Sequence, residues 1–144
     1  MITSSVGLSP SQAKYVTTLS GPFIDFVIDI RVGSPTFGQW DSVLLDTVDR
    51  RAIYLSEGVG HAICSLQDNS TVMYLCSATY DPAREHAIKP RDPELGLAMP
   101  EGVTPVLSAR DAAAPSLSEA AAQGLLPRYD QCAAYYASLA SSSL

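Results

Sequence analysis

Hydrophobic and polar residues alternate most regularly in the segment Phe23–Arg31. Every second position there carries a large apolar side chain: Ile24, Phe26, Ile28 and Ile30. Most of the residues between them are polar, with Asp25 and Asp29 among them. A period of two is typical of a β-strand, because successive side chains point to opposite faces of the sheet. We therefore predict a strand over 23–31 with one apolar face and one mostly polar face.

Five further segments are predicted to be strands, because they are rich in β-branched and aromatic residues: Lys14–Ser20, Trp40–Asp46, Arg51–Leu55, His61–Leu66 and Val72–Tyr80. Turn residues such as Gly21-Pro22 and Asp68-Asn69 separate them. Short strands with turns at roughly 8–12-residue spacing indicate an all-β sandwich or barrel. So few strands would leave apolar edges unpaired, and such edges aggregate unless they are covered. We therefore expect a partner subunit or further strands.

The chain changes character after Pro90. Prolines and glycines punctuate residues 91–111, which indicates an irregular arm laid over the barrel. Ser116 and Glu119 then have the spacing of a capping box, so a helix is predicted to begin there and to end near Gly124. An alanine-rich second helix is predicted to follow at 129–140.

A length of 144 residues is typical of a single domain. We divide it into barrel strands at 12–90, the irregular arm at 91–111 and a helical segment at 112–144. The net charge of −6 argues against a nucleic-acid-binding protein, which needs a basic face. It leaves room for one small anionic ligand, because a few well-placed cations can hold a diphosphate.

No apolar run approaches the roughly 20 residues that a membrane-spanning helix needs. The first residues, Met1–Ser20, also lack the basic start and hydrophobic stretch of a signal peptide. The three cysteines share no CxxC spacing, which favours free thiols in a reducing compartment. We therefore expect a cytoplasmic protein without a membrane partner.

Four residues near the apolar strands could carry chemistry. Lys14 begins a predicted strand, as a solvated strand end or as a cation that stabilises a developing anion. His61 follows a glycine-rich turn, where a histidine is more often structural than functional. Tyr74 and Tyr80 share parity, so they could pack in the core, or could supply a proton donor and a stacking surface.

A metal site has little support in the sequence. Its only two histidines, His61 and His86, lie far apart, and no HxH pair is present. We therefore expect no metal. The glycine-rich nucleotide motifs and the GxSxG motif of hydrolases are absent as well. The residues alone thus predict a β-barrel domain with polar groups inside.

One long motif adds a family to this description. Residues Asp29–Trp40 read D-I-R-V-G-S-P-T-F-G-Q-W, which resembles the signature D-x-R-x-G-S-P-T-F-G-x-W of the dTDP-4-dehydrorhamnose 3,5-epimerases. Four further stretches resemble motifs of that family in the same order: Gln12–Val16, Tyr54–Ala62, Val72–Tyr74 and Leu107–Asp111. The resemblance covers Pro10–Leu126, and it is as close to the antibiotic-sugar epimerases as to the rhamnose enzymes.

The resemblance implies a cupin-type double-stranded β-helix, or jelly roll, with no cofactor. It also implies a homodimer that exchanges N-terminal strands. The implied substrate is a dTDP-4-keto-6-deoxyhexose of rhamnose or deoxysugar biosynthesis. A base removes the proton at C5, C3 or both, an enolate forms beside the C4 ketone, and reprotonation from the other face inverts the carbon.

The same resemblance implies roles for single residues. Lys14 matches the lysine that stabilises the enolate oxygen, and Tyr74 matches the acid that reprotonates the carbon. Asp111 matches the carboxylate that orients the catalytic histidine. Three further residues match substrate-binding positions: His61 in the sugar-nucleotide site, Tyr80 in the pocket wall and Arg110 near the diphosphate.

The sequence departs from the family at the base. In the family the base is the histidine of an R-G-x-H strand, about ten residues before the lysine. Counting back from Lys14 leads to Met1–Ser5, with Ser4 where the histidine belongs. One interpretation is an epimerase that lacks its N-terminal segment and is therefore impaired in activity. His61 would then be the substitute base, although the family places this histidine beside the base and not in its role. The alternative is a non-catalytic barrel-domain paralogue that binds or dimerises with an intact epimerase.

Overall fold

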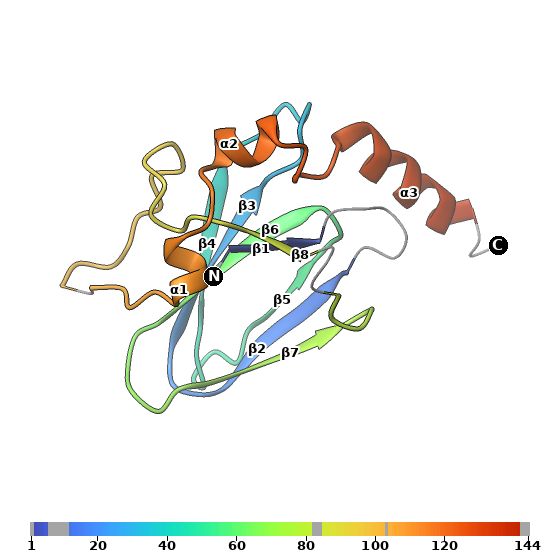
Figure 1. Cartoon of the computed structure of the whole chain (residues 1–144). Coiled ribbons are helices and arrows are strands. Elements are labelled where there is room, and N and C mark those ends of the chain that lie inside the picture. Colours follow the sequence, from blue (N-terminus) through green and yellow to red (C-terminus); the bar gives the residue numbers. More distant parts are fainter. Residues whose placement is uncertain (1, 6–11, 82–84, 103, 142–144) are drawn as a thin grey trace.

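The computed structural model of the chain describes residues 2–5, 12–81, 85–102 and 104–141. Within these ranges, eight strands form two antiparallel sheets that face each other (Figure 1). The larger sheet has the strand order β4 (Trp40–Leu45), β3 (Phe23–Asp29), β6 (Val59–Ser65), β1 (Ile2–Ser5) and β8 (Glu85–Ile88). The smaller sheet has the order β5 (Ala52–Leu55), β2 (Lys14–Ser20) and β7 (Thr71–Cys76).

Strands β2 to β7 confirm the six strands that the hydrophobic pattern predicts, with small differences at their ends. The largest difference is at β7, which ends at Cys76, so the predicted extension to Tyr80 is wrong. Strands β1 and β8 were not predicted. Each has four residues, and so short a segment carries too little periodicity to identify it.

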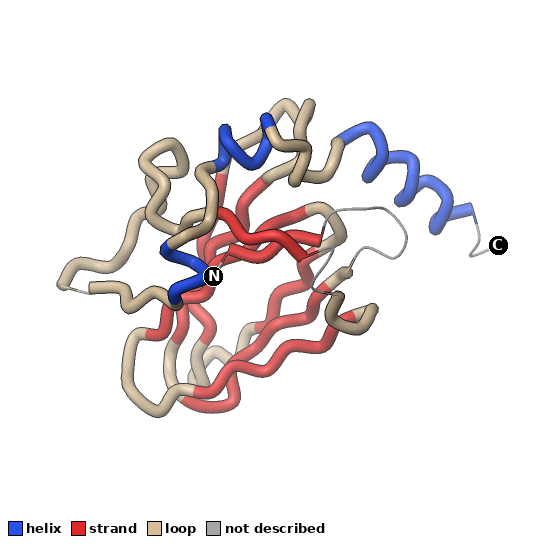
Figure 2. The backbone as a smooth tube through the Cα atoms, in the orientation of Figure 1, coloured by secondary structure: helices blue, strands red, loops and turns tan. Residues whose placement is uncertain are grey.

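The larger sheet is covered on both faces. Its outer face packs against the arm and the helical segment, through a core that includes Phe26, Ile28 and Leu117. Its inner face packs against the smaller sheet around Val16 and Leu55. Figure 2 shows the strands as two layers, with α2 on the side of the larger sheet that faces away from the smaller one. Strand β3 lies between β4 and β6, so its alternate residues enter two different cores.

The arm between Pro90 and Ser108 is irregular, as predicted, and it is anchored by specific contacts. The indole nitrogen of Trp40 donates to the carbonyl oxygen of Leu95 at 2.8 Å. The carboxylate of Asp92 accepts a hydrogen bond from the backbone nitrogen of Leu117 at 2.6 Å. These bonds tie the arm to β4 at one point and to the helical segment at another.

Three short helices follow the arm in the described residues: α1 (Ala109–Ala112), α2 (Leu117–Ala122) and α3 (Tyr129–Ser141). The predicted capping box of α2 is present, because Ser116 and Glu119 exchange hydrogen bonds. Helix α3 confirms the predicted second helix, whereas α1 was not expected. None of the helices in the described part of the chain is long and apolar enough to cross a lipid bilayer.

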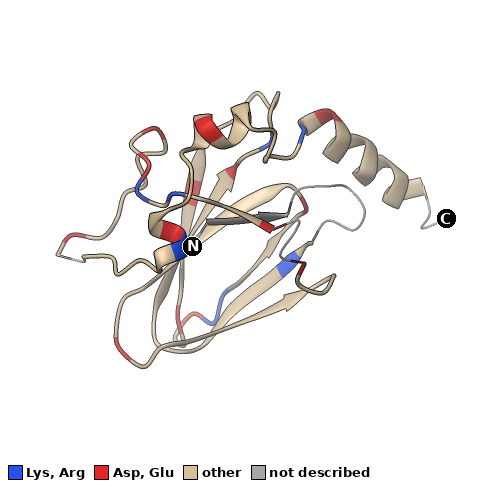
Figure 3. Ribbon diagram, viewed as in Figure 1, with Lys and Arg blue, Asp and Glu red and all other residues tan. Residues whose placement is uncertain are grey.

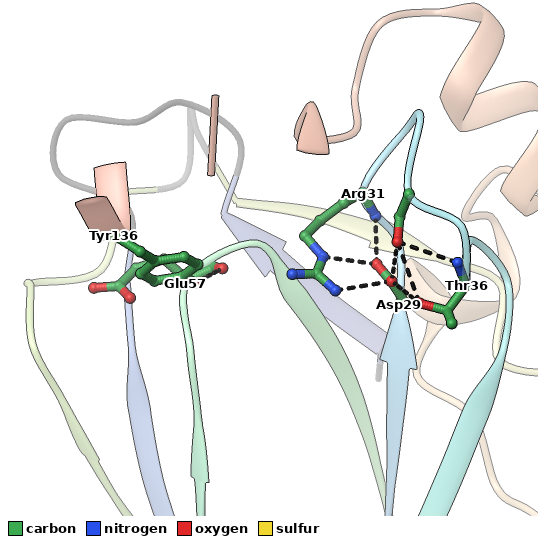
Figure 4. A network of polar contacts seen from close by, with 6 residues as sticks. Asp29, Arg31, Thr36, Glu57 and Tyr136 are labelled. Carbon is green, nitrogen blue, oxygen red and sulfur yellow. Dashed lines mark hydrogen bonds and ion pairs between the residues drawn. The ribbon is translucent and has the colours of Figure 1, made fainter. Parts of the chain in front are cut away.

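The signature loop is organised by one carboxylate at the end of β3. Asp29 accepts hydrogen bonds from both Nε and an Nη of Arg31, each at 2.8 Å (Figure 4). The hydroxyls of Ser34 and Thr36 also donate to it, each at 2.6 Å. Burial favours the neutral acid, but these hydrogen bonds outweigh it and hold the pKa of Asp29 well below its usual range.

Helix α3 is attached to this loop and to the turn between β5 and β6. The guanidinium of Arg31 lies 5.2 Å from the ring centre of Tyr129. The buried Cys132 packs against Gly58, where an added Cβ would come within 2.6 Å of its sulfur. Tyr136 donates a hydrogen bond to the carbonyl oxygen of Glu57 (Figure 4).

The Asp29 network predicts a large cost for a small change. Replacing Asp29 with Asn removes the charge that Arg31 and the two hydroxyls share. We expect a loss of about 2–4 kcal/mol in the free energy of unfolding, since hydrogen bonds to charged groups contribute more than neutral ones. Urea unfolding at pH 7 measures it. The control is Asp49→Asn, which breaks an exposed ion pair with Arg51 and should cost less than about 1 kcal/mol.

The same variant has a defined pH dependence. Because the pKa of Asp29 is lower in the folded state, its contribution is fully present above the unfolded value of about 3.9. It is lost as the pH falls below that value towards the folded pKa. The stability difference between wild type and Asp29→Asn should therefore shrink below about pH 4. A difference that stays constant from pH 7 to pH 3 would contradict the network.

Candidate functional site

A cavity of about 590 Å³ lies between the two sheets, at the end where β2 begins and β7 finishes. Five of the six residues singled out from the sequence line it: Lys14, His61, Tyr74, Tyr80 and Arg110. Strands β2 and β7 form one wall and β6 and β8 the other, while α1 contributes at the rim. The fold thus brings residues from distant parts of the chain to one place.

Strand register places Lys14 and Tyr74 on the same inner face. Val16, which is completely buried between the sheets, is the register partner of Tyr74. Lys14 lies two residues before Val16, so it shares that face, and its own partner is Cys76. The ammonium group and the phenol therefore enter the cavity from neighbouring strands.

The opposite wall carries a buried histidine–carboxylate pair. Nδ1 of His61 lies 3.3 Å from both carboxylate oxygens of Asp25, which is fully buried on the adjacent strand β3. A carboxylate is an acceptor, so the ring nitrogen that faces it is the one that carries the proton. The other nitrogen, Nε2, is then the basic one. His61 lines the cavity, so this pair is an oriented imidazole at the edge of an open space.

Arg110 connects the helical segment to the rim. One guanidinium nitrogen donates to the hydroxyl of Tyr80 at 3.2 Å, and another donates to the carbonyl oxygen of Glu85 at 2.9 Å. Tyr80 lies beyond the end of β7, yet it still lines the cavity. The cation and the phenol are therefore held together at one side of the opening.

Asp111 lies apart from the other predicted residues. It is buried in α1, where its carboxylate accepts a hydrogen bond from the hydroxyl of Ser108 at 2.8 Å. It lines a second cavity of about 550 Å³, on the outer side of β6 and beneath the arm. Its expected role towards a catalytic histidine stays a prediction.

The structure adds site residues that sequence reasoning missed. Asp25 was noted only as a polar position of a strand, although a carboxylate within a strongly apolar run is itself a signal. Glu85 is 8% exposed and lines the cavity from β8. Gln12 and Cys76 complete the polar wall on the side of the smaller sheet. Their common feature is spatial, and no short motif contains them.

Strand β1 occupies the place next to His61. It pairs with β6 on one side and with β8 on the other, and Thr3 is the register partner of His61. The segment to which the family resemblance assigns the base, with Ser4 at that position, is therefore the neighbour of the histidine strand.

The arrangement suits acid–base chemistry on a polar organic ligand. An ammonium group, a phenol and an imidazole surround one space, and each can donate or accept a proton or stabilise a negative charge. Figure 3 shows the Lys and Arg positions of the described residues on several separate elements. Within the described ranges, no three histidine, cysteine or carboxylate side chains are grouped to hold a metal ion.

Comparison with known proteins agrees with this geometry. The family model described as dTDP-4-dehydrorhamnose 3,5-epimerase matches residues 7–119. A dTDP-4-dehydrorhamnose 3,5-epimerase from Mycobacterium tuberculosis is 63% identical over 126 residues, which cover 86% of this chain. The match spans only 62% of that relative's length.

Solved structures give the same result in three dimensions. The rmlC epimerase of Mycobacterium tuberculosis superimposes with a TM-score of 0.89 and 57% identity, covering 93% of this chain and 68% of that one. ChmJ, a 3'-monoepimerase from Streptomyces bikiniensis in complex with dTDP-quinovose, has a TM-score of 0.87 and 47% identity. That match covers 90% of this chain and 65% of ChmJ.

The histidine–carboxylate pair predicts a specific tautomer. We expect neutral His61 to carry its proton on Nδ1, because Asp25 accepts it there. Long-range ¹H–¹⁵N correlation spectra distinguish the two tautomers. In Asp25→Asn the fixed acceptor is replaced by an amide, so the Nε2–H form should become populated. His86, the second histidine, serves as the control in the same spectra. A proton on Nε2 of His61 in the wild type would contradict the assignment.

Proposed function

Because the chain belongs to the dTDP-4-dehydrorhamnose 3,5-epimerase family, we propose that its fold serves the epimerisation of a dTDP-4-keto-6-deoxyhexose. The main support for this proposal is the cavity between the sheets, in which Lys14 and Tyr74 lie on one wall and His61 on the other. Its volume is in the range of small-molecule sites. The reaction belongs to dTDP-rhamnose or deoxysugar biosynthesis, and three free cysteines favour the cytoplasm.

The proposed chemistry follows from the three side chains. A base removes the proton from C5, C3 or both, and the electrons move into the C4 carbonyl to give an enolate. The ammonium group of Lys14 stabilises the negative oxygen, which lowers the barrier in a cavity partly shielded from water. The phenol of Tyr74 returns a proton to the carbon from its own side, and the configuration is inverted.

Substrate binding is proposed to use the rim. Arg110 supplies a positive charge for the diphosphate, and its bond to Tyr80 fixes that aromatic ring at the opening. His61 lines the sugar site from β6, and the buried carboxylate of Glu85 can accept hydrogen bonds from sugar hydroxyls. Asp111 matches the carboxylate that orients the family's catalytic histidine, whose position in this chain is held by Ser4.

The base is the weak point of this 144-residue chain. Ser4 stands at the family's base position, so we propose that the chain by itself turns over slowly. Of its two histidines, His61 is the one that lines the cavity and has a buried carboxylate behind it. It is therefore the residue through which any residual proton abstraction would run.

A second candidate function rests on a different surface. The outer face of the smaller sheet exposes a row of apolar side chains, with Tyr15 between its register partners Tyr54 and Leu75. Exposed apolar patches of this kind are typical of protein–protein interfaces. We propose that this face is buried in a homodimer, or against an intact epimerase if this chain is a non-catalytic partner. We also propose that the two sheets are the halves of a cupin-type jelly roll.

Proton exchange tests the proposed chemistry. The chain is incubated with dTDP-4-keto-6-deoxyglucose in D₂O, and deuterium at C3 and C5 is followed by NMR. We expect slow exchange, which falls a further hundredfold or more in His61→Asn, because general bases typically contribute 10²–10⁴-fold. The matched control is His86→Asn, whose side chain does not line the cavity.

Each outcome has a distinct meaning. Rapid exchange that both histidine variants retain would contradict the missing base and point to another group. Exchange that disappears equally in both variants would indicate a folding defect instead. No exchange at all, together with heterodimer formation with an intact homologue, would favour the non-catalytic partner.

The proposed interface predicts the effect of charge on association. Tyr54→Lys and Leu75→Lys place ammonium groups in the apolar face, so we expect the dimer dissociation constant to rise at least tenfold. Sedimentation velocity over a concentration series measures it. Val48→Lys is the control, since Val48 is 85% exposed in a turn outside this face. Unchanged association in the two face variants would exclude this surface as the interface.

A further inference from the structure

The three cysteines of the chain occupy different environments. Cys132 is buried on α3 and Cys64 is half-buried on β6, and burial raises the pKa of both thiols. Cys76 is exposed at the end of β7. The thiolate is the reactive form of cysteine, and it must be accessible to the reagent that it attacks. Burial therefore protects Cys132 and Cys64 from reaction, whereas Cys76 is accessible.

Cys76 also lines the proposed active-site cavity. It is the register partner of Lys14, and opposite residues of an antiparallel pair have their Cβ atoms about 4.5–5.5 Å apart. Both residues line the cavity. When this sulfur attacks an electrophile, the leaving group develops its negative charge near an ammonium group, which favours the attack.

A second feature of the cavity points independently to a polar ligand. The side chain of Glu85 is more than nine-tenths buried, lines the same space, and has no carboxylate hydrogen bond to the described residues. A buried acceptor with such a vacancy is usually completed by a ligand or by water. The thiol of Cys76 therefore faces a space built for a polar molecule.

We propose that Cys76 is an oxidation-sensitive thiol whose modification closes this cavity to its anionic ligand. The oxidant is a peroxide. The sulfur attacks one peroxide oxygen, the O–O bond breaks, and the second oxygen leaves as hydroxide, which takes up the thiol proton to form water. Sulfur is oxidised to a sulfenic acid and peroxide oxygen is reduced. Cys64 lines the other cavity and Cys132 is buried, so neither shares the space in which the sulfenic acid forms.

Thiol mapping tests the selectivity. The chain is treated with hydrogen peroxide and dimedone, and the labelled peptides are quantified by mass spectrometry. We expect Cys76 to be labelled at least tenfold faster than Cys64 or Cys132. Cys76→Ser should abolish the fast labelling, and the matched Cys64→Ser should leave it unchanged. Equal rates at the three thiols, or faster labelling of Cys64, would overturn the proposal.

Ligand binding tests the consequence, and this part rests on the proposed function. The probe is dTDP, measured by titration calorimetry before and after oxidation. We expect oxidation to weaken binding at least tenfold in the wild type, a thiol reductant to restore it, and Cys76→Ser to be insensitive. Unchanged binding by the oxidised protein would overturn the proposal. If reduced protein does not bind dTDP, the proposed ligand is wrong, whereas the labelling pattern still decides the reactive thiol.

Discussion

The interaction on which the rest of the structure depends is the set of hydrogen bonds to the carboxylate of Asp29. Strand β3 lies between β4 and β6 in the larger sheet, and the chain must reverse sharply after it to begin the antiparallel β4. Arg31, Ser34 and Thr36 turn towards one acceptor and fix that reversal. Arg31 then contacts Tyr129, so the same loop also seats the C-terminal helix. Arg31, Ser34 and Thr36 of the signature motif thus have a structural role in this loop, through their shared acceptor.

The signature motif and the cavity lie in different parts of the molecule, so the residues that indicate family membership are not those that would carry out catalysis. The motif that identifies the family lies outside the cavity, whereas the groups suited to proton transfer come from β2, β6 and β7. Behind His61, which lines the cavity, lies the fully buried carboxylate of Asp25, and its desolvation cost is offset because Nδ1 of His61 is 3.3 Å from both of its oxygens.

The sequence predicts the parts that depend on local pattern. Period two identifies β3, residue composition and turn spacing identify β2 and β4 to β7, and the Ser116–Glu119 spacing identifies the start of α2. Lys14, His61 and Tyr74 could be nominated through motif resemblance, and the fold brings them to one cavity. Asp25 offered one signal, a carboxylate within an apolar run, and Glu85 offered none, since the importance of both comes from which strand lies beside them. Strands β1 and β8 were not predicted, because their pairing with each other, rather than their composition, makes them strands.

Strand β3 has a consequence for how this protein can change. Its odd-numbered residues, such as Asp25 beside His61, lie on the inner face, towards the smaller sheet. Phe26 and Ile28 lie on the outer face and pack in the core that includes the arm. Substitutions on the inner face are therefore constrained by the cavity, and those on the outer face by packing against the arm, so the two sets can change independently. A single-residue insertion within the strand would exchange the two sets completely, because side chains alternate strictly. Variation along β3 is consequently limited to replacement, and length differences among relatives should fall in the loops that flank it.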